Sequence, residues 1–128
     1  MDREIFESYV SEALQDIPEE FRRHLENVEI VLEEFPTGYQ MHKMRLIHKW
    51  QLFGLYEGVP LPRRGSGYAG VLPDKITLFM IPILRFATSE EHLKRIITNV
   101  VWHEIGHYFG MNEEEVRAME KRRGVSYT

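Results

Sequence analysis

Residues 88–110 read TSEEHLKRIITNVVWHEIGHYFG, and this stretch decides the fold. Thr88 and Ser89 are both good N-cap residues, and Thr88 with Glu91 fits a capping box, so a helix should begin here. Its apolar residues recur at helical spacing: Leu93, Ile96, Ile97, Val100 and Val101. The pattern continues without a break to Gly110, a residue typical of helix C-termini. We therefore expect one helix that carries the whole His-Glu-Ile-Gly-His segment.

Two histidines of this helix, His103 and His107, stand four residues apart. Side chains at that spacing lie about 6 Å apart on one helix face and can converge on a single ion. Glu104 is rotated about 100° from His103, beside the open position of such an ion, where its carboxylate can take a proton from bound water. These residue types indicate metal-assisted hydrolysis of an amide. The alternative is that the pattern arose by chance. From average residue frequencies, on the order of a few chains of this length per thousand should contain it.

The longer run HEIGHYFGMNE, residues 103–113, resembles the extended zincin motif of two helical histidines, a glycine turn and a third ligand three residues later. In metzincins the third ligand is histidine, whereas here the position is Glu113. In this it resembles the small bacterial zincin-like metallopeptidases, which are minimal single-domain proteins with an acidic residue there. The resemblance extends over most of the chain, including PEEF at 18–21, VEI at 28–30, LFGLY at 52–56 and LPDKI at 72–76.

The resemblance implies a minimal zincin-like α+β fold in a single domain, residues 1–128. A small mixed β-sheet would pack against the active-site helix and flanking helices. It also implies a zinc metallopeptidase with one Zn²⁺ per chain, bound by His103, His107 and Glu113, and with Glu104 as the general base. Two histidines and a carboxylate also suit other divalent ions, so the resemblance, and not the residue types, indicates zinc.

The role of Glu113 has a competing interpretation. It also fits an acidic first-turn residue that complements the dipole of a helix beginning after Asn112, and Glu114 and Glu115 are competing ligands. Gly110 favours ligation, since a left-handed residue there would turn the chain back toward the ion.

The rest of the chain divides into short segments. We predict helices over Arg3–Ile17 and Glu19–Glu26, strands over 28–33, Leu52–Gly58 and Lys75–Leu84, a loosely helical stretch over Tyr39–Trp50, and a last helix after an Asn112–Glu115 capping box. Pro82 cannot donate a ladder hydrogen bond, which indicates an edge position or a strand end, and we take Lys75–Leu84 as the candidate sheet edge. Zincins hold an extended peptide against such an edge, which makes this strand the candidate substrate site. The alternative is that its apolar residues simply fill the core: Ile76, Leu78, Phe79 and Ile81.

The composition limits the classes of ligand and partner that we expect for this chain. The chain has 128 residues, a net charge of −4 and no cysteine, so any metal must use histidines and carboxylates, and a nucleic-acid role is disfavoured. The sequence shows no apolar run long enough to span a membrane, and its N-terminus does not have the basic region followed by an apolar stretch that is typical of a signal peptide. We expect a cytoplasmic monomer that acts on a peptide or protein substrate.

Two other function classes stay open. One is a catalytically weak or silent zincin-like module that binds metal or a protein partner, which the retained Glu104 argues against. The other is hydrolysis of a non-peptide amide. Candidate donors to the tetrahedral oxyanion are Tyr68, Tyr108 and Tyr127, and residues 65–70 fit either a flap or a flexible loop. The remaining histidines, at 24, 42, 48 and 92, fit surface or capping positions.

Overall fold

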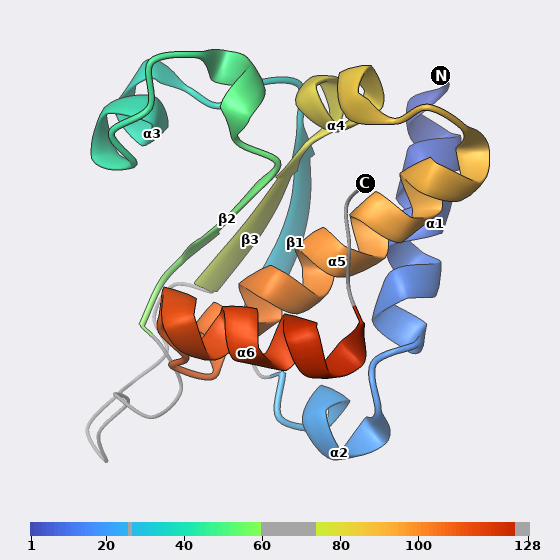
Figure 1. Ribbon diagram of the computed structural model, residues 1–128, viewed down its shortest axis with the longest axis vertical. Coiled ribbons are helices and arrows are strands. Elements are labelled where there is room, and N and C mark those ends of the chain that lie inside the picture. Colours follow the sequence, from blue (N-terminus) through green and yellow to red (C-terminus); the bar gives the residue numbers. More distant parts are fainter. Residues whose placement is uncertain (26, 60–73, 125–128) are drawn as a thin grey trace.

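The structure is a computed structural model that describes residues 1–25, 27–59 and 74–124 (Figure 1). Its elements in chain order are α1 (Arg3–Gln15), α2 (Glu19–Arg22), β1 (Val28–Glu33), α3 (Gly38–Lys43), the 3-10 turn η1 (Lys49–Gln51), β2 (Gly54–Glu57), β3 (Asp74–Phe79), α4 (Met80–Phe86), α5 (Glu90–Tyr108) and α6 (Glu113–Arg123). Of the segment predicted to be loosely helical, two short pieces, α3 and η1, form helical turns.

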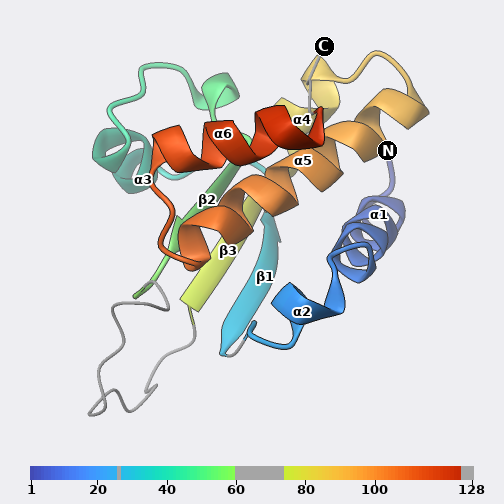
Figure 2. The same cartoon turned by 60° about the horizontal axis from the view of Figure 1, so that its bottom comes forward.

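The three strands of the described residues form one small mixed sheet in the order β1-β3-β2. β1 runs parallel to β3 with Ile30 opposite Ile76, and β2 runs antiparallel to β3 with Leu55 opposite Thr77. Figures 1 and 2 show α5 and α1 on one face of this sheet, with α6 crossing α5. This is the α+β arrangement predicted from the sequence, a small mixed sheet packed against the motif helix.

The core lies between that face of the sheet and the two helices. Ile76 and Leu78 of β3, Phe6 of α1, and Ile96 and Ile97 of α5 are fully buried there. Burial of each aliphatic or aromatic side chain of this size contributes about 1.5–3 kcal/mol relative to exposure. The apolar stripe of α5 is therefore what fixes the helix, and the motif at its end, against the sheet.

The prediction for Lys75–Leu84 is wrong in two respects. The strand ends at Phe79 and α4 begins at Met80, and β3 is the central strand and not an edge. Pro82 is the third residue of α4, inside the first helical turn, where a backbone N–H has no intrahelical partner and its absence costs little. The edge strand beside α5 is β2.

Capping contacts fix the ends of the two helices that carry the motif. Ser89, not Thr88, is the N-cap of α5, because its side chain accepts from the backbone N–H of His92. The His92 ring caps the same end by accepting at Nδ1 from the Thr88 backbone N–H at 3.0 Å, which confirms a capping role for this buried histidine. At the start of α6 the predicted Asn112–Glu115 capping box is present. None of the helices in the described ranges is long and apolar enough to cross a membrane.

Candidate metal centre

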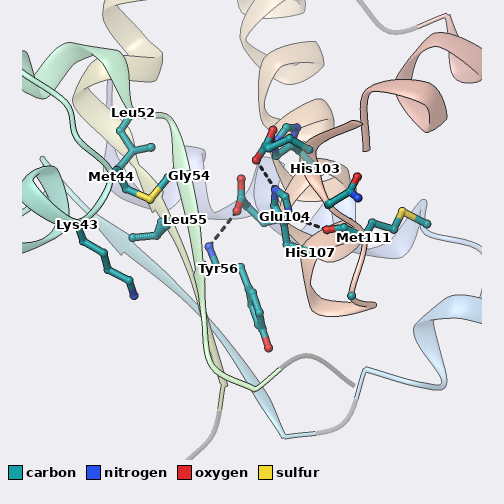
Figure 3. Close-up of a pocket in the computed structure, with 13 residues that line it drawn as sticks. Lys43, Met44, Leu52, Gly54, Leu55, Tyr56, His103, Glu104, His107 and Met111 are labelled. Atoms are coloured by element: carbon teal, nitrogen blue, oxygen red, sulfur yellow. Dashed lines mark hydrogen bonds and ion pairs between the residues drawn. The ribbon is translucent and has the colours of Figure 1, made fainter. Parts of the chain in front are cut away.

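His103 and His107 lie on the last two turns of α5 (Figure 3). Their imidazoles face the carboxylate of Glu113, the first residue of α6. Glu113 Oε2 is 3.5 Å from His103 Nε2, and Glu113 Oε1 is 2.8 Å from His107 Nε2. One ligand atom from each of the three residues lies within 4.8 Å of the other two. Tetrahedral zinc with bonds of about 2.0–2.2 Å sets its ligand atoms about 3.3 Å apart. The three residues therefore fit a zinc site with a small adjustment of the side chains.

The hydrogen bonds on the far side of each ring strengthen that fit. His107 Nδ1 lies 2.9 Å from the carbonyl oxygen of Met111, and His103 Nδ1 lies 3.2 Å from a carboxylate oxygen of Glu120. A carbonyl and a carboxylate only accept, so each Nδ1 must donate, and each neutral ring is left with a bare Nε2 lone pair. Those two lone pairs meet a third acceptor, the Glu113 carboxylate. Three acceptors directed at one point repel one another unless protons or a cation lie between them.

The turn between α5 and α6 brings Glu113 to the two histidines. Gly110 has a φ of 87°. The Gly110 N–H donates to the His107 carbonyl and the Met111 N–H donates to the Gly106 carbonyl, which is the Schellman pattern of a helix end. The turn reverses the chain, directs the Met111 carbonyl at His107 and presents Glu113 to the histidines. The close approach of α6 depends on Gly106, because a Cβ there would lie 3.0 Å from Cγ2 of the buried Val116.

Glu104 is held apart from the three converging groups, in a nearly closed environment. Glu104 is 6% exposed, and its Oε1 accepts a hydrogen bond of 2.9 Å from the backbone N–H of Tyr56 on β2 (Figure 3). Burial raises the pKa of the Glu104 carboxyl, an effect that the neighbouring histidines and the Tyr56 N–H oppose and that Glu113 reinforces. A carboxyl with a raised pKa beside a metal site is better suited to take up and release a proton than an ordinary exposed carboxylate.

β2 forms the wall of the site opposite α5. Gly54 allows the contact, because a Cβ at this position would lie 2.5 Å from Val100 Cγ1 and 3.3 Å from Glu104 Cγ, both on α5. Between β2 and α5 opens a cleft of about 440 Å³. Figure 3 shows its two walls, with Lys43, Met44, Leu52 and Leu55 on one side and the histidines with Met111 on the other.

Among the competing acidic residues, only Glu113 joins the histidines in the described part of the chain. The Glu115 carboxylate instead accepts from the Asn112 backbone N–H at 3.1 Å in the capping box. Glu114 is exposed on α6.

Of the three candidate oxyanion donors, Tyr108 alone lies among the described residues. The proposal of Tyr108 is wrong, since its fully buried hydroxyl donates to the carbonyl of His24 at 3.0 Å, and it does not line the cleft. Tyr68, Tyr127 and the segment 65–70 lie outside the described residues.

Two contacts at the site were not predicted from the sequence: the contact between Tyr56 and Glu104, and the contact between Glu120 and His103. The Tyr56 contact is made by a backbone N–H, for which a sequence carries no signal. Glu120 does carry one, since Glu113, Val116 and Glu120 are spaced three and four residues apart and so share one face of α6.

Comparison with known proteins agrees with this geometry. A family model described as zincin-like metallopeptidase matches residues 25–123, a range that runs through the sheet, the motif helix and α6. No curated protein matches the chain by sequence. Because the family model covers well over half of the chain, including the paired histidines, Glu104 and Glu113, the chain belongs to the zincin-like metallopeptidases.

Proposed function

We propose that this protein is a zinc-dependent peptidase that binds one Zn²⁺ through His103, His107 and Glu113 and uses Glu104 as its general base. The observation that carries the proposal is the convergence of three acceptor groups beside a buried carboxyl whose pKa is raised. When bound, zinc would polarise the scissile carbonyl and lower the pKa of water toward about 7.

Glu104 performs the proton transfers in this proposal. Tyr56 holds Glu104 Oε1 through the backbone N–H, which leaves Oε2 as the oxygen that would accept a proton from the reacting water. As the water oxygen attacks the carbonyl carbon, Glu104 takes a proton from it and then delivers that proton to the amide nitrogen. The C–N bond breaks and the second proton of the water passes to the same nitrogen, so the products are a carboxylate and a protonated amine, and Glu104 returns to its starting state. No covalent intermediate with the protein is formed.

The outer edge of β2, on the side away from β3, is the proposed binding site of the peptide backbone. The Phe79 N–H donates to the Phe53 carbonyl, so in this antiparallel pair the backbone groups of Phe53 and Leu55 face β3. Those of Gly54 and Tyr56 then point away from β3, as the Tyr56 contact with Glu104 illustrates. An extended peptide that adds along this edge would cross the cleft beside the histidines. The apolar wall formed by Leu52, Leu55 and Met44 favours apolar side chains in the substrate.

Zinc binding tests the ligand set first. Tag-free protein stripped with a chelator is titrated with zinc against a competing indicator, and we expect one ion per chain. Zinc sites in small peptides provide about 10–16 kcal/mol over four ligands, so the loss of one ligand in Glu113→Ala should weaken binding by about 60- to 700-fold. Glu114→Ala removes the same charge from the same helix and should bind like the parent. Equal binding by Glu113→Ala and the parent would exclude Glu113 as a ligand.

Turnover tests the mechanism separately. The zinc-loaded parent should cleave members of a quenched fluorescent peptide library, and Glu104→Gln should bind zinc nearly as well without cleaving. A glutamine keeps an oxygen for the Tyr56 N–H but cannot accept the proton. Equal cleavage by the two would refute the general-base assignment. Tight zinc binding by a parent that cleaves no peptide would favour the alternative of a silent metal-binding module.

A further inference from the structure

Glu120 differs from the other acidic residues of α6. Its side chain is 14% exposed, whereas that of Glu113 is 55% exposed. Its carboxylate lies against the ring of His103, with Oε1 3.2 Å from Nδ1, the ring nitrogen opposite the converging Nε2 atom. A glutamate loses much of its hydration when it is buried to this extent, so a partner at the buried end is needed to compensate.

Helix packing explains why Glu120 faces His103 and not solvent. Val116, four residues before Glu120 and therefore on the same face, is fully buried and would contact a Cβ at Gly106. The contact between Val116 and Gly106 sets the rotation of α6 about its axis. With that rotation fixed, Glu113 reaches the Nε2 side of the histidines and Glu120 reaches the Nδ1 side of His103.

We propose that Glu120 is a positioning residue for the metal centre, which holds His103 as the Nδ1–H tautomer with Nε2 bare and directed at the ion. The inference rests on the proposed zinc site. A neutral imidazole places its proton on either nitrogen, and the partner of one nitrogen decides which. Without an acceptor at Nδ1 the proton is free to move to Nε2, where it blocks the ligand atom.

The two histidines are held by different kinds of group, and this makes the proposal testable. His107 donates to the backbone carbonyl of Met111, which no side-chain substitution removes. The acceptor of His103 is a side chain, so substitution of Glu120 perturbs one ring and leaves the other as an internal reference.

The first measurement needs no metal. In ¹⁵N-histidine-labelled, chelator-treated protein, long-range ¹H–¹⁵N spectra at a pH where the rings are neutral distinguish the two tautomers. The measurement is made in a Glu113→Ala background, because the Glu113 carboxylate would otherwise compete for a proton at both Nε2 atoms. In that background we expect His103 and His107 both to carry the proton on Nδ1. In Glu120→Ala, His103 should shift toward Nε2–H while His107 does not change. Glu120→Gln retains an oxygen that accepts from Nδ1–H and should restore the original pattern. Because this readout is independent of zinc, it also tests the proposal if the protein binds no metal.

The second measurement is zinc affinity in the same variants. Loss of such a partner typically costs about 10–100-fold in metal affinity, so we expect that loss in Glu120→Ala. Glu120→Gln should remain within about threefold of the parent, as should the exposed control Glu114→Ala. An unchanged His103 tautomer in Glu120→Ala, or parent-like affinity, would overturn the proposal. Equal losses in the alanine and glutamine variants would assign the effect to charge and also overturn positioning. Melting temperatures of the metal-free variants identify any that fail to fold.

Discussion

The contact between β2 and α5 at Gly54 leads to a quantitative stability prediction. A Cβ at this position would lie 2.5 Å from Val100 Cγ1, about 1 Å inside an ordinary carbon–carbon contact. Val100 is 3% exposed and its branched side chain is stiff, so it cannot turn away easily. Gly54→Ala must therefore move the strand, the helix or both.

The size of the effect follows from two opposing contributions. Overpacking of a core typically costs about 1–3 kcal/mol, and the short distance and stiff neighbour place this case in the upper part of that range. Replacement of glycine by alanine in a strand returns about 0.5–1 kcal/mol through the unfolded chain. We expect a net loss of about 1–2 kcal/mol, or about 3–10 °C in Tm for a domain of this size.

A double-mutant cycle isolates the clash. Val100→Ala removes the atom that the new Cβ would meet, so Gly54→Ala should be neutral or slightly stabilising in that background. The coupling between the two substitutions should be roughly 1.5–3 kcal/mol. Gly38→Ala is the matched control, because a Cβ at Gly38 has no neighbour within 4 Å. Thermal and urea unfolding of the four proteins of the cycle measure these values. The same destabilisation by Gly54→Ala in both backgrounds would refute the steric explanation.

Three further predictions concern the site itself. Burial raises the pKa of Glu104, so ionisation of this group destabilises the folded metal-free protein. Glu104→Gln should therefore have a higher Tm than the parent at pH 8. The difference in Tm should shrink as the pH falls, because Glu104 of the parent then takes up a proton. Gly106→Ala should change Tm little, because about 1 kcal/mol of helix propensity offsets the 3.0 Å contact with Val116, but should weaken zinc binding as α6 shifts. Gly110→Ala places a Cβ at a φ of 87° and should cost about 1–2 kcal/mol in urea unfolding, with Gly110→Asn less damaging.

The motif helix was predictable from the sequence because every signal that defines it is local. Helical periodicity and capping residues located α5 to within two residues at its start, and the spacing of His103 and His107 gave their common face. The position of Glu113 also follows from local geometry, because a left-handed residue at Gly110 leaves few directions in which the chain can continue.

The edge of the sheet was not predictable by the same means. The run from Lys75 to Leu84 is apolar almost throughout, and such a run fits a buried strand or a buried helix equally well. Pro82 is compatible with either a strand edge or a first helical turn, and only the packing of α4 distinguishes them. Strand order depends on long-range pairing, which places β3 between β1 and β2. Residues that meet across such distances leave no periodic signal.

The division between local and long-range contacts separates metal binding from catalysis. The three proposed ligands lie within residues 103–113, on one helix end, one turn and the start of the next helix. Glu104, in contrast, is oriented by the Tyr56 N–H, 48 residues away on β2. A displaced β2 should therefore impair the proposed general base and the proposed peptide site while the proposed ligands stay in place, whereas a displaced α6 should impair zinc binding. Gly54→Ala and Gly106→Ala perturb these two contacts from opposite sides of α5. The first should lose cleavage at nearly constant zinc affinity, and the second should lose zinc affinity before cleavage at saturating zinc.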